Sequence, residues 1–231
     1  MKPVNVIVVG RSGRMGLEIE AVAKDSGLVN IVGGVGREPD GLEACFLALE
    51  KAGQLVDVVI DFSLPVATVD VTKVCVRRKI PLVSGVTGLS EAERNALSHA
   101  GSDIPVLYSA NMSIGVQILA KALDALKGVD GFDLSIEETH HRHKRDRPSG
   151  TALLIDDELL KRTGKRASEI VSLRGGGVVG DHRVLAFSDS EVLTFGHQAL
   201  NRAVFARGAC RAARWIVGKP AGSYSLADTL G

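Results

Sequence analysis

Aromatic residues and long apolar runs are scarce in this chain, and each scarcity excludes a class of protein. Phe, Trp and Tyr make up only 4% of the 231 residues, so aromatic platforms for stacked nucleic-acid bases are not expected. No apolar run approaches the roughly 20 residues that a membrane-spanning helix needs. The N-terminal residues lead straight into a strand-like segment, and we therefore expect no signal peptide.

The cysteines are few and far apart. Cys45, Cys75 and Cys210 are odd in number, and their wide spacing suits neither a disulfide scaffold nor a zinc ribbon. This pattern favours a reducing, cytoplasmic compartment.

An excess of charge of either sign is also missing. The 28 Lys and Arg residues are balanced by 27 Asp and Glu residues, for a formal net charge of +1, so no global attraction draws the chain to DNA or to a membrane surface. What is present is 45% hydrophobic and 24% charged, the composition of a soluble globular protein with one large or two small domains. The 26 glycines indicate tight turns and places where the backbone approaches a ligand.

The first half of the chain alternates between apolar runs and helical patterns. We expect strands at residues 4–9, 28–35, 55–62, 80–84 and 104–109, and helices at 14–26, 41–52, 66–78 and 90–99. Each strand is apolar throughout rather than at every second residue. That pattern predicts an α/β fold with a parallel sheet covered on both faces.

After Asn111 the pattern changes. We expect helices at 114–126, 151–162 and 202–217, and strands at 132–138, 172–173, 183–187 and 191–195. Several of these strands follow one another without a helix between them, which predicts a second domain with a mostly antiparallel or mixed sheet. The last helix could return to cover the first sheet.

A glycine-rich loop follows the first strand and opens the first helix. Gly10, Gly13 and Gly16 form a GxxGxxG pattern, in the strand–turn–helix context of a dinucleotide-binding loop. In that reading Gly10 permits the turn, Gly13 lets a pyrophosphate approach the helix amides, and Gly16 lets the helix pack closely. The alternative is a glycine-rich turn without a ligand. The loop residues that we expect to bind cofactor are Gly10, Arg11, Ser12, Gly13, Arg14 and Met15.

The end of the second strand bears on the choice of cofactor. An acidic residue at this place normally binds the adenosine ribose hydroxyls, but here the residue is Gly36. Arg37 follows and could face a 2′-phosphate, whereas the alternative is that Arg37 and Glu38 are solvated loop charges. We expect NADPH to serve at least as well as NADH.

Further polar turns follow three more of the expected strands. They are Asp61-Phe62-Ser63, Gly85-Val86-Thr87 and Ser109-Ala110-Asn111-Met112. Ligands bind at the carboxyl edge of open α/β sheets, so the common position of these turns predicts that they line a cofactor cleft. We include Phe62, Ser63, Gly85, Val86, Thr87, Ser109, Ala110, Asn111 and Met112 among the cofactor-binding residues.

The densest cluster of histidines and charged side chains spans residues 137–151. His140 and Lys144 are four residues apart, a spacing that one helical turn would place on one side. Ser149 is a candidate N-cap, and the amides of Ser149, Gly150 and Thr151 could receive an anion. These features predict a pocket for a small polyanion beside a group that titrates near neutral pH. A solvated basic loop is the alternative. A zinc site is disfavoured because no cysteine or third ligand lies near His140 and His143 in the sequence. A nucleic-acid patch is disfavoured by the neutral overall charge of the chain and by the absence of interleaved aromatic residues.

This segment resembles the signature of the 4-hydroxy-tetrahydrodipicolinate reductase (dihydrodipicolinate reductase) family of the diaminopimelate and lysine pathway. The signature residues are His140, His141, Lys144, Asp146, Pro148, Ser149, Gly150, Thr151 and Ala152. Further family motifs occur in family order over the whole chain, at residues 10–16, 61–63, 85–88, 110–115, 180–182 and 202–209. The sequence departs from the family pattern at Gly36, where many members carry an acid, at Met112, where Phe is usual, and at Arg147, where Ala is usual.

The resemblance implies a fold and an assembly. It implies a Rossmann dinucleotide-binding domain of residues 1–112 and 206–231, and a domain of residues 113–205 that binds substrate and forms a homotetramer. It also implies a hinge near residues 111–113 and 206–208.

The resemblance also implies an activity: NAD(P)H-dependent reduction of a small cyclic imine dicarboxylate, with loss of water. His140 would be the acid/base group and Lys144 the proton donor. His141, Lys144, Ser149, Gly150 and Thr151 would hold the carboxylates. Two other functions stay open on the residues alone, a non-catalytic NAD(P)-binding redox sensor and another Rossmann dehydrogenase that acts on a small dicarboxylate.

Overall fold

The computed structural model describes residues 2–36 and 41–231, and the chain divides into two compact units. One unit comprises residues 1–112 and 205–231, and the other comprises residues 113–204. The second junction therefore falls one residue before the expected one. Arg37 lies outside the described residues.

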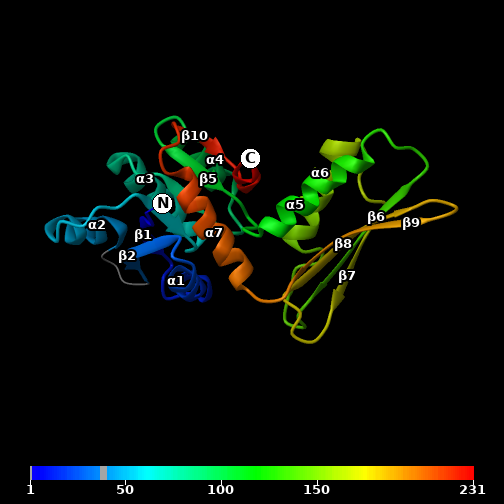
Figure 1. Ribbon diagram of the computed structural model, residues 1–231, viewed down its shortest axis with the longest axis horizontal. Helices are drawn as coiled ribbons and strands as arrows, with labels where there is room; N and C mark the ends of the chain where they lie inside the picture. Colours follow the sequence, from blue (N-terminus) through cyan, green and yellow to red (C-terminus); the bar gives the residue numbers. More distant parts are fainter. Residues whose placement is uncertain (1, 37–40) are drawn as a thin grey trace. The chain divides into compact units, whose positions relative to one another are not determined.

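Six strands form the parallel sheet of the first unit within the described residues, in the order β10-β5-β4-β3-β1-β2 (Figure 1). The strands are β1 (Val4–Val9), β2 (Val29–Val35), β3 (Val58–Asp61), β4 (Leu82–Ser84), β5 (Pro105–Tyr108) and β10 (Gly222–Tyr224). The helices are α1 (Arg14–Ser26), α2 (Gly41–Lys51), α3 (Pro65–Arg78), α4 (Glu91–Ala100) and α7 (Ala203–Ile216), with a final 3₁₀ turn at Leu226–Leu230. The strands are parallel, and β2 and β3 lie on opposite sides of β1, an arrangement of the doubly wound, Rossmann-like α/β sheets.

Both faces of this sheet are buried, which explains why its strands are apolar throughout. On one face Ile7, Val59 and Leu82 pack with residues of α2, α3 and α4. The alternate residues Val8 and Ile60 point to the other face and are also fully buried. The prediction of a parallel sheet covered on both sides is confirmed.

The second unit has a mixed four-stranded sheet in the order β7-β6-β8-β9. Its strands are β6 (Asp133–His140), β7 (Glu169–Arg174), β8 (Gly180–Phe187) and β9 (Val192–Ala199), and its helices are α5 (Ile114–Ala122), a 3₁₀ turn (Leu123–Leu126) and α6 (Gly150–Thr163). β7 pairs with β6 in parallel, whereas β8 runs antiparallel to β6 and β9. The expected second sheet is confirmed.

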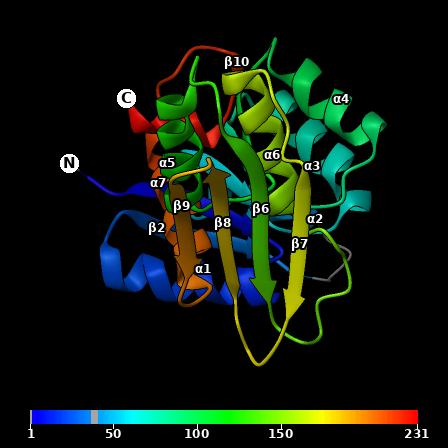
Figure 2. The same ribbon diagram turned by 90° about the vertical axis from the view of Figure 1, so that its right-hand side faces the viewer.

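The two faces of the second sheet differ. Helices α5 and α6 lie on one face (Figure 1), where Ile136, Val184 and Ile155 form a buried core. The opposite face (Figure 2) carries no helix of this unit in the described part of the chain, and Val171, Leu173 and Phe187 are exposed there. This second unit therefore has an apolar sheet face that its own helices do not cover.

Three local predictions differ from the structure. The α-helix expected over 114–126 ends at Ala122, and a 3₁₀ turn follows it at Leu123–Leu126. β7 is six residues long rather than two, and β10 was not expected at all. β10 pairs with Pro105–Leu107, more than a hundred residues earlier, and so short a strand has no pattern of its own. No helix within the described residues is long and apolar enough to cross a membrane.

Candidate active site

The glycine loop of the first unit is built by close backbone approach. Gly10 has a φ of +81°, and a Cβ there would lie 2.6 Å from the carbonyl oxygen of Phe62, which follows β3. A Cβ on Gly16 would lie 2.2 Å from the carbonyl oxygen of Arg11, so only glycine lets α1 start against the loop. No side chain caps the N-terminus of α1 at Gly13, and no acid occupies its first turn. The cradle therefore suits an anion at a helix N-terminus.

The other expected cofactor residues lie at the same edge of the sheet. Phe62 and Ser63 follow β3, Gly85, Val86 and Thr87 follow β4, and Ser109, Ala110, Asn111 and Met112 follow β5. A Cβ on Gly85 would lie 2.4 Å from the ring of Phe62, so the far end of that ring packs against the loop after β4. Met112 is only 2% exposed, so its thioether does not reach the surface of this unit.

Arg11 and Gly36 define the surroundings of the end of β2. The Arg11 guanidinium is paired with Glu20 of α1, and its side chain crosses β2 so closely that no Cβ would fit at Gly34. Gly36 lies beside Ser12, whose Oγ would be 3.4 Å from a Cβ at that position. No carboxylate stands at Gly36, and the expected partner Arg37 is outside the described residues.

In the second unit a row of polar side chains crosses the helix-covered face of the sheet. The strand register places Glu138 of β6 opposite Ser172 of β7 and His182 of β8, and His182 opposite His197 of β9. His140 lies two residues beyond Glu138 on the same face, opposite Arg174. The alternation along β6 thus changes from apolar to polar at its C-terminal end.

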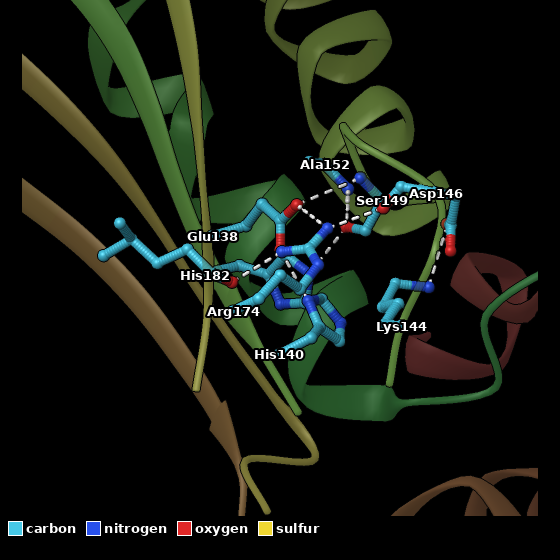
Figure 3. A network of polar contacts seen from close by, with 9 residues as sticks. Glu138, His140, Lys144, Asp146, Ser149, Ala152, Arg174 and His182 are labelled. Atoms are coloured by element: carbon cyan, nitrogen blue, oxygen red, sulfur yellow. Dashed lines mark hydrogen bonds and ion pairs between the residues drawn. The ribbon is translucent and has the colours of Figure 1, made fainter. Parts of the chain in front are cut away.

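Glu138 is the hub of this cluster (Figure 3). Its carboxylate accepts hydrogen bonds from Arg174 Nη1 and Nη2 at 2.8 and 2.7 Å, from His140 Nδ1 at 2.5 Å and from the Ser149 amide at 3.2 Å. Burial alone would raise the pKa of Glu138, but the bonds from Arg174, Ser172 and His140 outweigh burial and lower it to about 2. The carboxylate is therefore ionised at neutral pH although its side chain is fully buried.

His140 is 7% exposed, and burial lowers its pKa while the Glu138 carboxylate opposes that shift. Since an ionised carboxylate only accepts hydrogen bonds, Nδ1 of His140 carries a proton and Nε2 is left with a lone pair when the ring is neutral. The ring thus presents one nitrogen for proton transfer.

Lys144 lies in the loop between β6 and α6, and its ammonium is 2.9 Å from Asp146 Oδ2. The expectation that one helical turn carries both His140 and Lys144 is wrong, because His140 ends a strand and the Lys144 amide bonds the His141 carbonyl in a turn. The charge of Lys144 nevertheless reaches His140 and lowers its pKa. His141 is half-buried beside the His143 ring.

The start of α6 is as predicted, with Ser149 as N-cap accepting a bond from the Ala152 amide at 3.2 Å. Ser149 is 1% exposed, and its hydroxyl also meets His182 Nε2 at 3.3 Å. Gly150 is exposed with open space around it, and Thr151 follows in the first turn. The helix N-terminus is thus held by Ser149, and the Gly150 amide donates to the Asp146 carboxylate.

Glu138, Arg174 and His182 were missed as site residues by the sequence analysis. A usable signal exists for Glu138, because residues two apart on a strand share a face, and His140 is its neighbour at that spacing. Arg174 and His182 reach the cluster from other strands and carry no local signal. No group of three or more His, Cys, Asp or Glu residues in the described part of the chain could hold a metal ion.

Sequence comparison with known proteins identifies the family to which the chain belongs. The N-terminal model of dihydrodipicolinate reductase matches residues 4–112 and the C-terminal model matches residues 112–230. The chain is 43% identical to the 4-hydroxy-tetrahydrodipicolinate reductase of Bdellovibrio bacteriovorus, over 100% of this chain and 97% of that protein. It is 42% identical to the reductase of Xanthomonas campestris pv. campestris, over 99% and 98%.

Solved structures show the same fold. The dipicolinate-bound dihydrodipicolinate reductase of Paenisporosarcina sp. TG-14 matches with a TM-score of 0.79 at 18% identity, over 98% of this chain and 99% of that chain. An oxidoreductase from Sinorhizobium meliloti matches with a TM-score of 0.62 at 11% identity, over 100% and 94%. On the family models and the identities over the full chain, the protein belongs to the dihydrodipicolinate reductase family.

Proposed function

We propose that the protein is a 4-hydroxy-tetrahydrodipicolinate reductase that uses NAD(P)H to form tetrahydrodipicolinate with loss of water, in diaminopimelate and lysine biosynthesis. The observation that carries the proposal is the juxtaposition of His140, held by a buried carboxylate, with Lys144 and the N-terminus of α6. An imidazole for proton transfer beside fixed positive charge suits a small dicarboxylate. The similarity to reductases over the full chain supports the same activity.

The first unit fits a nicotinamide dinucleotide. The cradle at Gly10, Gly13 and Gly16 leaves no room for a Cβ at two of its three glycines, and it ends on an uncapped helix N-terminus. Bound there, the dinucleotide supplies the hydride. The proposed binding residues are Gly10, Arg11, Ser12, Gly13, Arg14, Met15, Arg37, Phe62, Ser63, Gly85, Val86, Thr87, Ser109, Ala110, Asn111 and Met112.

NADPH is proposed to serve at least as well as NADH. Gly36, the last residue described after β2, has no side-chain carboxylate that could repel a 2′-phosphate or bind a 2′-hydroxyl. Ser12 Oγ lies beside Gly36 and can donate to either group. Arg37 is next in sequence and offers a guanidinium for a phosphate.

The second unit is proposed to hold the substrate. Lys144 offers its charge to the carboxylates, and His141 and the Gly150 and Thr151 amides offer N–H donors. A substrate carboxylate would take the place of the Asp146 carboxylate at Lys144 and at the Gly150 amide. Ser149 contributes by fixing the start of α6, since its amide donates to Glu138 and its hydroxyl caps Ala152. Nε2 of His140 takes and returns the proton that the loss of water requires, and the Lys144 ammonium provides the proton that follows hydride addition.

The test is oxidation of reduced nicotinamide by the purified protein, with and without the cyclic substrate generated in the cuvette from pyruvate and aspartate semialdehyde by the upstream synthase. Oxidation that depends on the cyclic product supports the reductase. Tight NADPH binding without turnover would identify a redox-sensing module instead. Turnover with another dicarboxylate alone would identify a different dehydrogenase.

The assembly is proposed to be a homotetramer in the cytoplasm, built through the sheet of the second unit. The face that carries Val171, Leu173 and Phe187 leaves apolar side chains exposed, and a second copy would bury them. Light scattering at micromolar concentration should give the mass of four chains. Leu173→Asp should shift that mass downward, whereas Leu55→Asp, at an exposed leucine of the other unit, should not.

A further inference from the structure

A buried ion pair lies behind the proposed acid/base group. Glu138 of β6 and Arg174 of β7 face each other with two nearly parallel hydrogen bonds of 2.7 and 2.8 Å. The side chains are 0% and 3% exposed. Removing two charges from water is costly, and a buried pair is weak evidence for stability alone. We therefore looked to the site for the function of this ion pair.

Each arm of the pair ends on a different part of the site (Figure 3). Glu138 Oε2 accepts from His140 Nδ1 at 2.5 Å, and Oε1 accepts from the Ser149 amide that starts α6 at 3.2 Å. Arg174 Nη2 donates to the Asp146 carbonyl at 2.6 Å, in the loop that carries Lys144. One pair thus holds the imidazole, the helix start and the lysine loop.

The imidazole is also confined from its other side. A Cβ at Gly180 would lie 3.2 Å from His140 Nε2, so a side chain at position 180 would crowd the imidazole ring. The His182 ring meets the His140 ring edge to face, with centroids 5.0 Å apart. Rotation of the His140 ring would break the bond to Glu138 and meet β8 or His182.

We propose that Glu138 is a positioning residue that holds His140 in the tautomer with a proton on Nδ1, and that Arg174 keeps this carboxylate in place and ties the Lys144 loop to it. The inference rests on the proposed function, in which His140 Nε2 moves the proton. It adds a residue pair that acts on the reaction through His140 rather than by touching the substrate.

The charges around His140 give this role a measurable consequence. Glu138 on its own strand favours the protonated imidazole, while Arg174 on β7 and Lys144 in the loop disfavour it. His182 on β8 is a further titratable neighbour. Replacing Glu138 by a neutral isostere removes the anion and should lower the pKa of His140 further.

The first experiment compares Glu138→Gln with Glu137→Gln, the same change one residue earlier on the opposite face of β6. Glu138→Gln should lower kcat by up to about 10⁴-fold, as loss of the carboxylate that orients a catalytic histidine does, and leave the KM for NADPH unchanged. The limb of the pH profile that reports His140 should move to lower pH. Glu138→Asp, which keeps the anion, should move it less.

The second experiment reads the tautomer directly from long-range ¹H–¹⁵N spectra of the six histidine rings, with His140 assigned by its loss in His140→Gln. The unmodified protein should show a protonated Nδ1 at His140. An Nε2-protonated ring there would overturn the proposal even if the Glu138 variants do not fold.

The double variant separates this proposal from the proposed function. If Glu138 acts through His140, adding Glu138→Gln to His140→Gln should change kcat less than threefold. If His140→Gln is impaired but Glu138→Gln behaves like Glu137→Gln, the positioning role fails and the proposed function stands. If His140→Gln retains full activity, the acid/base assignment fails instead.

Discussion

Nδ1 of His140 lies 2.5 Å from Oε2 of Glu138, two residues earlier on the same face of β6. The bond joins an imidazole, whose pKa is lowered by burial, to a carboxylate that water does not reach. Because Nδ1 is engaged by Glu138, Nε2 is the imidazole nitrogen that is available for proton transfer.

Replacing His140 by Gln should lower kcat by roughly 10²–10⁴-fold, the usual contribution of a general acid or base. The glutamine retains polarity but cannot accept a proton near neutral pH. Cofactor affinity, measured by fluorescence titration of NADPH, should stay near that of the unmodified protein. His99→Gln, at an exposed position on α4, is the matched control. Near-normal kcat for His140→Gln would remove this residue from the mechanism.

Replacing Lys144 by Ala should raise KM for the dicarboxylate and lower kcat together, because one ammonium is proposed to bind a carboxylate and to supply a proton. Steady-state kinetics at saturating NADPH measure both constants. Asp146→Asn removes the partner of Lys144 without removing the ammonium, and kcat should then stay within a few-fold. A cost confined to KM would leave Lys144 a binding residue only.

Replacing Gly36 by Asp should shift the cofactor preference toward NADH. A Cβ fits there at 3.4 Å from Ser12 Oγ, and the new carboxylate would repel a 2′-phosphate and accept from a 2′-hydroxyl. A change of about tenfold in the ratio of kcat/KM values corresponds to ~1.4 kcal/mol, reasonable for a partly exposed charge. Gly36→Asn has the same shape without the charge and should shift the ratio less. Equal ratios for the two variants would contradict this view of the end of β2.

Acid should destabilise the fold through His182, whose pKa burial lowers to about 3. Because this pKa is lower in the folded than in the unfolded chain, the contribution is complete above pH 6.5 and is lost as pH falls from 6.5 toward 3. Glu138 adds a loss only below about pH 4.5. His140 and His197, with lowered pKa values, and Asp61, with a raised one, contribute in the unmodified protein and in a His182 variant alike, so the difference between the two reports on His182.

Urea unfolding at fixed protein concentration measures this effect. Between about pH 6.5 and about pH 4.5 the free energy of unfolding should fall by about 1.4 kcal/mol per pH unit more in the unmodified protein than in His182→Gln. His99→Gln should keep the steeper slope because its side chain is exposed. Parallel slopes for the unmodified protein and His182→Gln would show that His182 is not held neutral.

Local patterns in the sequence were sufficient for most of the framework. Apolar runs between helical patterns predicted the parallel sheet, since burial on both faces demands apolar residues at every strand position. The glycine loop and the Ser149 cap could also be predicted from the sequence, because a turn and a helix start depend on the few residues that form them. The resemblance of residues 140–152 to the dihydrodipicolinate reductase signature indicated the family.

The amino-acid sequence alone was thus enough to predict most of the helices and strands, the glycine loop, the Ser149 cap and the resemblance to the family. Only the tertiary structure decided that β10 pairs beside β5, that His140 ends a strand rather than sharing a helical turn with Lys144, and that Arg174 meets Glu138. Glu138 and Arg174 are 36 residues apart, and their contact depends on the register of β6 against β7. Register is set by which side chains the whole sheet buries, a property of the packed chain that no short segment contains.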